Sequence, residues 1–278
     1  MPTQAEKAAV FHALHYQPEP LIVANPWDAG TARILTAIGF EAFSTTSGGL
    51  AITLGRRDGT ASVSRDEALA NAKTIVDATH LPVAADLENG YGHSPEAAAE
   101  TIRLAAAAGL VGGSIEDTST DLAHPIYDFT HAVERVAAAA EAACALPFPF
   151  MFVARAENYL HGRPDLEDTI RRLQAFEKAG AEVLYAPGLT RAEDIKAVCA
   201  AVSKPVNVLA ALKGAPHLSV AELAALGVRR ISLGSALSRA ALSAFIRASR
   251  EIKENGTFTF AAETFSLGEI SDLAAESS

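Results

Sequence analysis

Eight short apolar runs, each followed by a longer helical stretch, constrain the fold of this 278-residue chain more than any other feature. The runs are rich in β-branched and aromatic residues and lie at 21–24, 42–46, 82–87, 112–117, 150–155, 182–187, 205–210 and 229–234. Within them apolar and polar residues do not alternate, which indicates strands buried on both faces, as in a parallel sheet. Several helical stretches end in glycine just before the next run, as at Gly109, Gly180 and Gly227, where glycine commonly terminates a helix.

This alternation predicts an α/β fold, and because no linker or change of composition interrupts it, a (β/α)₈ TIM-type barrel. An open doubly wound sheet is the alternative. Its dinucleotide-binding fingerprint is missing, since the segment "GYGHSP" (90–95) has two of the glycines and lacks the third. We expect residues 1–278 to form one barrel domain.

The end of the chain is expected to mediate self-association. A long helical stretch follows the last run, and the segment 257–278 after it contains Phe258, Phe260 and Phe265. Three aromatic rings are too many for a free tail in water. We therefore predict that 257–278 is an extension that packs on a neighbouring subunit.

Charge and composition exclude several classes of partner. The formal net charge is −10 and no block of basic residues occurs, which argues against nucleic acid and anionic membranes as partners. No uncharged apolar run reaches the roughly 18 residues of a membrane span, and the N-terminal segment lacks the apolar centre of a signal peptide. We expect a cytoplasmic protein. Cys144 and Cys199, the only cysteines, lie in alanine-rich helical text and are expected to be buried thiols.

Carboxylates gather where the predicted strands end. Asp86 and Glu88 lie at the end of the third run, Glu116 ends the fourth, and Asp58 lies in the loop after the second. Residues two apart in a strand share a face, so Asp86 and Glu88 would point the same way, at the end of the barrel that carries active sites. Converging carboxylates repel one another unless a cation lies between them, and oxygen ligands suit Mg²⁺, with Mn²⁺ possible. The alternative is that Asp86 and Glu88 pair with lysines or cap the helix that begins at Ser94.

Five segments in order resemble the isocitrate lyase/phosphoenolpyruvate mutase superfamily. They are "SGG" (47–49), "LGRRD" (54–58), "DLENGYG" (86–92), "GGSIED" (112–117) and "ARAEN" (154–158), and the resemblance extends from "NPWDAG" (25–30) to "ISLGSALSRAAL" (231–242). It implies a (β/α)₈ barrel whose terminal helix is exchanged between subunits of a dimer or tetramer. It also implies Mg²⁺, a small anionic 2-oxo acid substrate, and the making or breaking of a C–C or P–C bond through an enolate.

The resemblance also implies roles for individual residues. Asp86 would bind the metal ion directly, and water molecules of that ion would be held by Asp58, Glu88 and Glu116. Arg155 would hold an oxygen of the substrate or leaving group by charge-assisted hydrogen bonds. The residues implied in substrate binding are Trp27, Ser47, Gly48, Gly49, Arg155 and Asn207, although Asn207 is offset from the family's asparagine. A salt bridge at the barrel rim is the alternative for Arg155, a plain turn for 47–49, and closure of the barrel end for Trp27.

Three departures from the family pattern concern the reaction. Glu88 stands where the family usually has Asp, and a role through water tolerates the extra methylene. The Lys-Arg-Cys-Gly-His loop of the lyase branch is replaced by a shorter segment without Cys or Lys, and its Pro-Glu after the sixth strand is replaced by "YAPGL" (185–189). His124 and Tyr127 are the candidates in the shorter loop to replace the cysteine as proton donor, and a capped surface loop is the alternative.

These features together predict an enzyme. The prediction is a Mg²⁺-dependent lyase that cleaves a C–C bond of a small 2-oxo or 2-hydroxy di- or tricarboxylate. P–C cleavage of a phosphonopyruvate-like substrate is the first alternative. A Schiff-base aldolase that uses Lys213 and a non-catalytic 2-oxo acid binder are the others.

Overall fold

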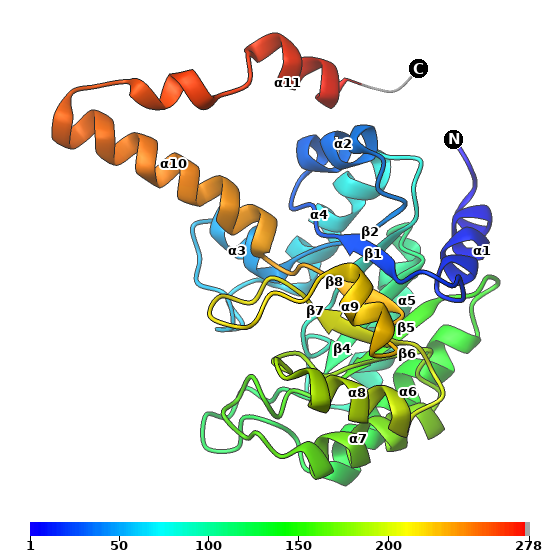
Figure 1. The fold of residues 1–278 in the computed structure, drawn as a ribbon. Helices are drawn as coiled ribbons and strands as arrows, with labels where there is room; N and C mark the ends of the chain where they lie inside the picture. The colour runs from blue at the N-terminus through cyan, green and yellow to red at the C-terminus, as the bar shows by residue number, and fades with distance from the viewer. Residues whose placement is uncertain (276–278) are drawn as a thin grey trace.

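Eight parallel strands of the computed structural model, which describes residues 1–275, close into a barrel (Figure 1). Each strand pairs with the next along the chain, and β8 pairs with β1 to complete the ring. The strands are β1 (Leu21–Ala24), β2 (Ala42–Ser44), β3 (Val83–Asp86), β4 (Gly112–Glu116), β5 (Met151–Arg155), β6 (Val183–Tyr185), β7 (Val206–Leu209) and β8 (Arg230–Ser232). The predicted (β/α)₈ barrel is confirmed, and the open doubly wound sheet is excluded because the ring is closed.

The helices begin where the sequence supplies capping side chains. Ser64 and Glu67 form a capping box at the start of α4, and Ser94 caps α5, whose first residue is Pro95. The helix start predicted at Ser94 is confirmed. The helices are α1 (Gln4–Leu14), α2 (Ala29–Ile38), α3 (Ser47–Thr53), α4 (Arg65–Asp77), α5 (Pro95–Ala107), α6 (Phe129–Cys144), α7 (Leu166–Lys178), α8 (Ala192–Ala201), α9 (Val220–Ala225), α10 (Ala236–Asn255) and α11 (Leu267–Ala274), with a 3₁₀ turn η1 (Thr259–Glu263). No helix among residues 1–275 has the length and apolarity needed to cross a membrane.

The side chains inside the barrel form a core separate from the one between strands and helices. In β6, Val183 and Tyr185 pack inside the barrel, whereas Leu184 between them packs outside it. Helix α1 covers the N-terminal ends of the strands, where the ring of Phe11 is fully buried among the interior residues. Gly112 begins β4 at this place, and a Cβ there would lie 3.0 Å from Cε1 of Phe11. Helix α1 therefore closes the end of the barrel opposite to the expected active site.

The two cysteines differ from expectation. Cys144, the last residue of α6, is exposed, while Cys199 in α8 is partly buried. The prediction of a buried thiol is wrong for Cys144. Its neighbours Ala142 and Ala143 are buried, and the 100° step between successive helical residues turns the next position toward solvent.

The last forty of the described residues leave the barrel as an arm, defined here as residues 236–275. Helix α10 points away from the barrel, and the chain then returns so that α11 lies near α2 (Figure 1). Large apolar side chains of this arm are exposed, among them Phe245 at 67%, Phe258 at 65% and Phe265 at 68%. This extent of exposed apolar surface is unusual for a protein surface that faces only water.

Candidate active site

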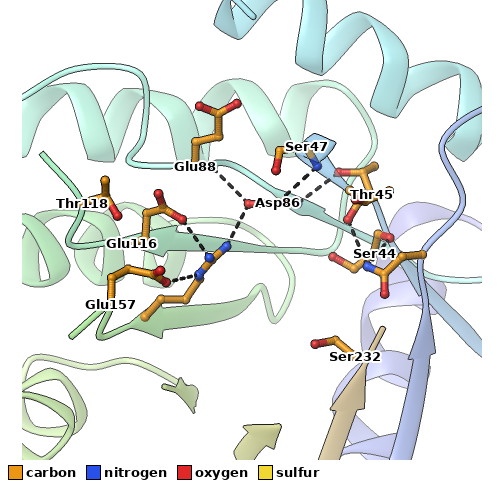
Figure 2. Close-up of polar contacts among 12 residues, drawn as sticks. Ser44, Thr45, Ser47, Asp86, Glu88, Glu116, Thr118, Glu157 and Ser232 are labelled. Carbon is orange, nitrogen blue, oxygen red and sulfur yellow. Dashed lines mark hydrogen bonds and ion pairs between the residues drawn. The ribbon is translucent and has the colours of Figure 1, made fainter. Parts of the chain in front are cut away.

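Three carboxylates surround the guanidinium of Arg155 at the C-terminal ends of β3, β4 and β5. Nη1 of Arg155 lies 3.1 Å from Oδ1 of Asp86, and Nη2 lies 2.9 Å from Oε2 of Glu116. Nε lies 2.8 Å from Oε1 of Glu157 (Figure 2). The strand register produces this arrangement, because Glu116 pairs directly with Arg155 across the β4–β5 ladder. The salt bridges expected as an alternative role for Arg155 are thus present, within the site that the carboxylates form.

Burial and mutual repulsion shift the acid–base properties of these carboxylates. Burial, followed by the charges of Asp86 and Glu116, raises the pKa of Glu88 to about 8. Burial also raises the pKa of Glu116, although Arg155 opposes that change. The pKa of Asp58 is raised by burial and then by Asp86. Burial is the largest cause of each of these three pKa shifts, and the charges of neighbouring carboxylates add to it.

The guanidinium of Arg155 is the main positive charge in this cluster. Burial lowers its pKa, but the attraction of Glu116, Glu157 and Asp86 outweighs burial and holds the pKa well above the ordinary value. One guanidinium faces five carboxylates, which are Asp58, Asp86, Glu88, Glu116 and Glu157. An additional cation would therefore be favoured at this place.

The donor set is compatible with Mg²⁺ or Mn²⁺. No three His, Cys, Asp or Glu side chains of the described chain are arranged to hold a metal ion together. Mg²⁺ in proteins usually keeps several waters and takes only one or two carboxylates, so a single direct ligand is sufficient. Asp86 offers two carboxylate oxygens at the centre of an oxygen-rich, negatively charged cluster. The residues present therefore fit a metal ion that Asp86 would bind directly. Asp58, Glu88 and Glu116 would hold the water molecules that complete its coordination.

Glu88 joins the cluster in a different way from that expected. Strand β3 ends at Asp86, and Glu88 adopts a left-handed backbone with φ of 46°. Its amide donates to Oδ1 of Asp86 at 3.2 Å. Its side chain points away from Glu116 and Glu157 (Figure 2) and lines a cavity of about 560 Å³. The prediction that Asp86 and Glu88 share a strand face is wrong, because the strand stops before Glu88.

The "SGG" segment forms the first turn of α3. Thr46 caps this helix, and its Oγ1 accepts from the amide of Gly49 at 3.3 Å. The amide of Ser47 points to Oδ2 of Asp86 at 3.4 Å. The alternative of a plain turn is therefore incorrect, and the segment lies directly beside the carboxylate cluster.

Close packing requires glycine at both positions after Ser47. A Cβ at Gly48 would lie 2.9 Å from Oδ2 of Asp58, and a Cβ at Gly49 would lie 2.9 Å from Cβ of Trp27. The structure thus brings Asp58 and Trp27 to the same rim as Ser47. All three were candidates from the sequence, as was each glycine.

Asn207 lies deeper in the barrel than the other candidates. It pairs in register with Tyr185 and Arg230, is 3% exposed, and donates through Nδ2 to Oγ of Ser232 at 2.9 Å. Its Oδ1 is buried without a hydrogen-bond partner. Its contacts are with the interior of the barrel, so substrate binding by Asn207 stays a prediction.

The shorter loop after β4 forms a small hairpin. Thr118 and Ile126 pair as an antiparallel bridge, and His124 lies at the tip with its side chain 81% exposed. Nδ1 of His124 lies 3.1 Å from the carboxylate of Asp121, also at the tip. This geometry matches the alternative of a capped surface loop for His124.

Tyr127 points toward the loop after β3. Its hydroxyl lies 2.7 Å from Nδ1 of His93, and its ring lies over the guanidinium of Arg135 at 4.7 Å. Burial raises the pKa of the Tyr127 phenol. Proton donation by Tyr127 or His124 stays a prediction.

Three further residues support Arg155 and were not expected from the sequence. Glu157 holds its Nε, and the amide of Glu157 donates to Oδ1 of Asp117 at 2.8 Å. Oδ2 of Asp117 pairs with Nη1 of Arg172 in α7 at 2.9 Å. Glu157 and Asp117 lie in the quoted motifs "ARAEN" and "IED", so a search of each strand end for every polar residue would have found them. No pattern in the sequence of α7 indicates that Arg172 pairs with Asp117.

Comparisons with known proteins identify the family of this chain. The family model described as phosphoenolpyruvate phosphomutase matches residues 11–253. The crystal structure of a candidate lyase/mutase from Burkholderia cenocepacia J2315 is 54% identical, with a TM-score of 0.95 over 99% of this chain and 97% of that chain. An uncharacterised protein of Mycobacterium tuberculosis is 32% identical over 88% of this chain and 89% of its own length. The oxaloacetate decarboxylase of Chromohalobacter salexigens is 28% identical over 91% of this chain and 88% of its own length. This chain belongs to the phosphoenolpyruvate phosphomutase family, within the isocitrate lyase/phosphoenolpyruvate mutase superfamily.

Proposed function

We propose that this protein is a Mg²⁺-dependent lyase that cleaves the C–C bond beside the oxo or hydroxyl group of a small di- or tricarboxylate. The observation that supports this most directly is the placement of Arg155 between Asp86 and Glu116 at the mouth of the barrel. A cationic group of fixed orientation beside a cation-binding carboxylate suits a substrate with adjacent carboxylate and oxo oxygens. When bound, Mg²⁺ would supply Lewis-acid polarisation of these oxygens.

Arg155 would act on the charge that develops during cleavage. In a 2-oxo substrate, breaking the C–C bond leaves its electron pair on the 2-oxo fragment as an enolate. In a 2-hydroxy substrate, the hydroxyl group loses its proton, its carbon becomes the new carbonyl, and the electron pair goes to the other fragment as the enolate of its carboxylate. In both cases an enolate oxygen carries negative charge. The guanidinium of Arg155 offers parallel N–H donors to such an oxygen, and Glu157 fixes its plane through Nε. The buried position of Arg155, 11% exposed, strengthens this interaction because little water screens it.

The substrate carboxylate would lie against α3. Ser47 supplies a hydroxyl and the backbone of Gly48 approaches closely because it has no side chain. Trp27 would cover the small substrate from the β1 side. Protonation of the enolate needs a donor, and Tyr127 remains the candidate that the hairpin offers.

A relative also supports C–C over P–C cleavage. The Chromohalobacter relative is named as an oxaloacetate decarboxylase, a C–C lyase. P–C cleavage is the second candidate, because the matching family model is described as a phosphomutase. Lys213 is exposed in the loop after β7 and so lacks the desolvation that activates a Schiff-base lysine.

A substrate panel tests the proposal. Purified protein is incubated with MgCl₂ and oxaloacetate, isocitrate, 2-methylisocitrate, 2-oxoglutarate or phosphonopyruvate, and the products are identified. We expect turnover of one C–C substrate, its loss in Arg155→Ala, and its retention in the exposed control Arg103→Ala. Phosphate release from phosphonopyruvate with every C–C substrate inert would favour the second candidate. Tight Mg²⁺-dependent binding with no turnover at all would indicate a non-catalytic binder.

A further inference from the structure

The loop 88–94, which carries Glu88, has an unusual backbone. Glu88 and Tyr91 are in the left-handed region with φ of 46° and 55°, and Gly90 between them has φ of 78°. Non-glycine residues adopt this region only when surrounding contacts outweigh the strain. The loop contains no strand or helix of its own that could supply those contacts.

The carbonyl groups of this loop are held mostly by side chains. Glu88 O accepts from the amide of Glu116 at 2.9 Å, and Gly90 O accepts from Oγ1 of Thr101 at 2.7 Å. The remaining acceptors are held from α6. Arg135 donates to Gly92 O at 2.7 Å, to Ser94 O at 3.1 Å and to Asn89 O, while Nε2 of His131 donates to His93 O at 2.8 Å.

The groups that hold the loop are spaced four residues apart. His131 and Arg135 therefore lie on one face of α6, while Tyr127 precedes the N-cap Asp128, and we name the three residues the α6 clamp. The ring of Tyr127 lies 5.0 Å from that of His131 and 4.7 Å from the Arg135 guanidinium, and its hydroxyl bonds to His93. The three residues contact the loop and one another as a unit.

Arg135 is the central member of the clamp. It is 1% exposed, and its acceptors among the described residues are backbone carbonyls rather than a carboxylate. Burying a guanidinium that no carboxylate accepts from is costly, so its hydrogen bonds to three carbonyls, together with the charge of the nearby Asp117, must have a compensating effect. A planar group with several fixed donors can hold three carbonyls of one loop in a single arrangement, which a lysine cannot do.

We propose that Arg135 is a positioning residue for Glu88, holding loop 88–94 in the conformation in which the amide of Glu88 bonds to Asp86 and its side chain extends from that point. This inference rests on the proposed function, in which Glu88 holds a water of the metal ion. Groups that orient the ligands of an ion contribute to its affinity without touching it. The α6 clamp would thus hold in place the backbone from which the Glu88 side chain extends. This side chain is one methylene longer than the Asp that the family usually has at this position.

The first test uses Arg135→Lys, which keeps the charge and loses the planar donors. Calorimetric titration with MgCl₂ should show affinity about 10-fold weaker than in the wild type. Hydrogen exchange without metal should show faster exchange of the amides in 88–94, with β5 unchanged. Arg103→Lys, on the exposed face of α5, is the matched control and should alter neither. Unchanged Mg²⁺ affinity or unchanged exchange in Arg135→Lys would overturn the proposal.

A double-mutant cycle tests whether Arg135 acts through Glu88. Arg135→Lys should weaken Mg²⁺ binding much less in a Glu88→Gln background than in the wild type, because the carboxylate that it positions is already removed. If the loss of Mg²⁺ affinity in the double variant equals the product of the losses in the two single variants, Arg135 does not act through Glu88. This holds even if each single variant binds Mg²⁺ weakly. A merely structural effect of Arg135 would not depend on the residue at 88.

Two further outcomes keep the test decisive. If Arg135→Lys does not fold, His131→Ala, which removes the donor to His93 O and the ring contact with Tyr127, should weaken Mg²⁺ binding about 2- to 3-fold and speed exchange at 93–94. No change in either would overturn the proposal. If the wild type binds no Mg²⁺, the proposed function fails, while exchange of 88–94 in Arg135→Lys still decides whether the clamp holds the loop.

Discussion

Arg155 Nη1 lies 3.1 Å from Oδ1 of Asp86, so the residue proposed to bind the substrate is paired with the residue proposed to bind the metal ion. Each neutralises the other in this arrangement. Arg155 becomes available to a substrate oxygen only when Asp86 has another cation as its partner. Binding of the two ligands should therefore be cooperative, and oxalate, a small dianion, should bind weakly without MgCl₂ and tightly with it.

Replacement of Asp86 by Asn should abolish the stabilisation by Mg²⁺ and lower kcat/KM by on the order of 10²- to 10³-fold. A ligand that binds only the native state stabilises it by about 2.7 kcal/mol at 100 times its Kd. The melting temperature with and without MgCl₂ measures this effect. Asp121→Asn, at the exposed hairpin tip, is the control and should behave as the wild type. Full activity of Asp86→Asn in EDTA would contradict the metal assignment.

Glu157→Gln should lower kcat about 10-fold, because the amide accepts from Nε of Arg155 without the charge that fixes the guanidinium. Glu157→Ala should lower it further, since it leaves Nε of a buried guanidinium without an acceptor. Steady-state kinetics that resolve kcat from KM are the measurement. The proposed orienting role would be refuted by Glu157→Ala with unchanged kcat and KM.

Gly49→Ala should both destabilise the protein and weaken substrate binding. The new Cβ would lie 2.7 Å from Cγ2 of Thr46 and 2.9 Å from Cβ of Trp27, so one of them must move, at a cost of about 1–3 kcal/mol. Gly30→Ala in α2 is the control, because its new Cβ would lie 3.6 Å from Oδ1 of Asp28, an ordinary contact. Urea unfolding gives the free energy, and oxalate titration gives the affinity. If Gly49→Ala has the unfolding free energy and oxalate affinity of the wild type, Thr46 or Trp27 can move aside at little cost.

His15 should make the fold sensitive to acid. It is 1% exposed, its Nδ1 lies 2.7 Å from Phe11 O, and its Nε2 lies 3.4 Å from Nη1 of Arg230. Because a carbonyl only accepts, Nδ1 carries the proton and Nε2 is the acceptor, which requires the neutral ring. Burial, followed by the charge of Arg230, lowers the pKa of His15 to about 3.

The sign of the pH dependence follows from that lowered pKa. The unfolded chain takes up a proton near pH 6.5 and the folded chain only near pH 3, so stability falls as the pH falls between these values, by about 1.4 kcal/mol per unit. In His15→Asn the Nδ2 group can still donate to Phe11 O, and nothing titrates. The difference in unfolding free energy between wild type and His15→Asn should therefore shrink from pH 7 to pH 4. An identical pH slope in both proteins would argue against the buried neutral ring, and exposed His217→Asn is the control.

The arm 236–275 should form the contact between subunits. Phe245, Phe265 and Leu267 are exposed by 67%, 68% and 82%, respectively. We expect the wild type to sediment as a dimer or larger at micromolar concentration, and Phe245→Ser with Phe265→Ser to shift it toward monomer. Leu122→Ser, which removes a 96% exposed side chain from the hairpin tip, should change nothing. A wild type that sediments as a monomer would refute the prediction.

The barrel was predictable because its strands carry their own signal. A run buried on both faces must be apolar along its whole length, and polar residues can begin only where the strand ends, as at Asp86 and Glu116. The contacts that orient these residues carry no such signal. Arg172 meets Asp117 across 55 residues and Arg135 meets Gly92 across 43, and in both cases the helix that supplies the arginine reads as an ordinary amphipathic sequence. The direction of Tyr127 likewise depends on His93, which lies in another loop.

The plug formed by α1 has a consequence for the order in which the molecule can assemble. Helix α1 is synthesised before every strand of the barrel, yet His15 at its C-terminal end contacts Arg230 across 215 residues, and Arg230 belongs to the strand that closes the ring. The contact between His15 and Arg230 can form only after β8 has been synthesised, so α1, which precedes the whole barrel, is among the last elements to complete its contacts. Until then the apolar face of α1 is incompletely covered, and we expect Phe11 to be a point of chaperone contact on the nascent chain.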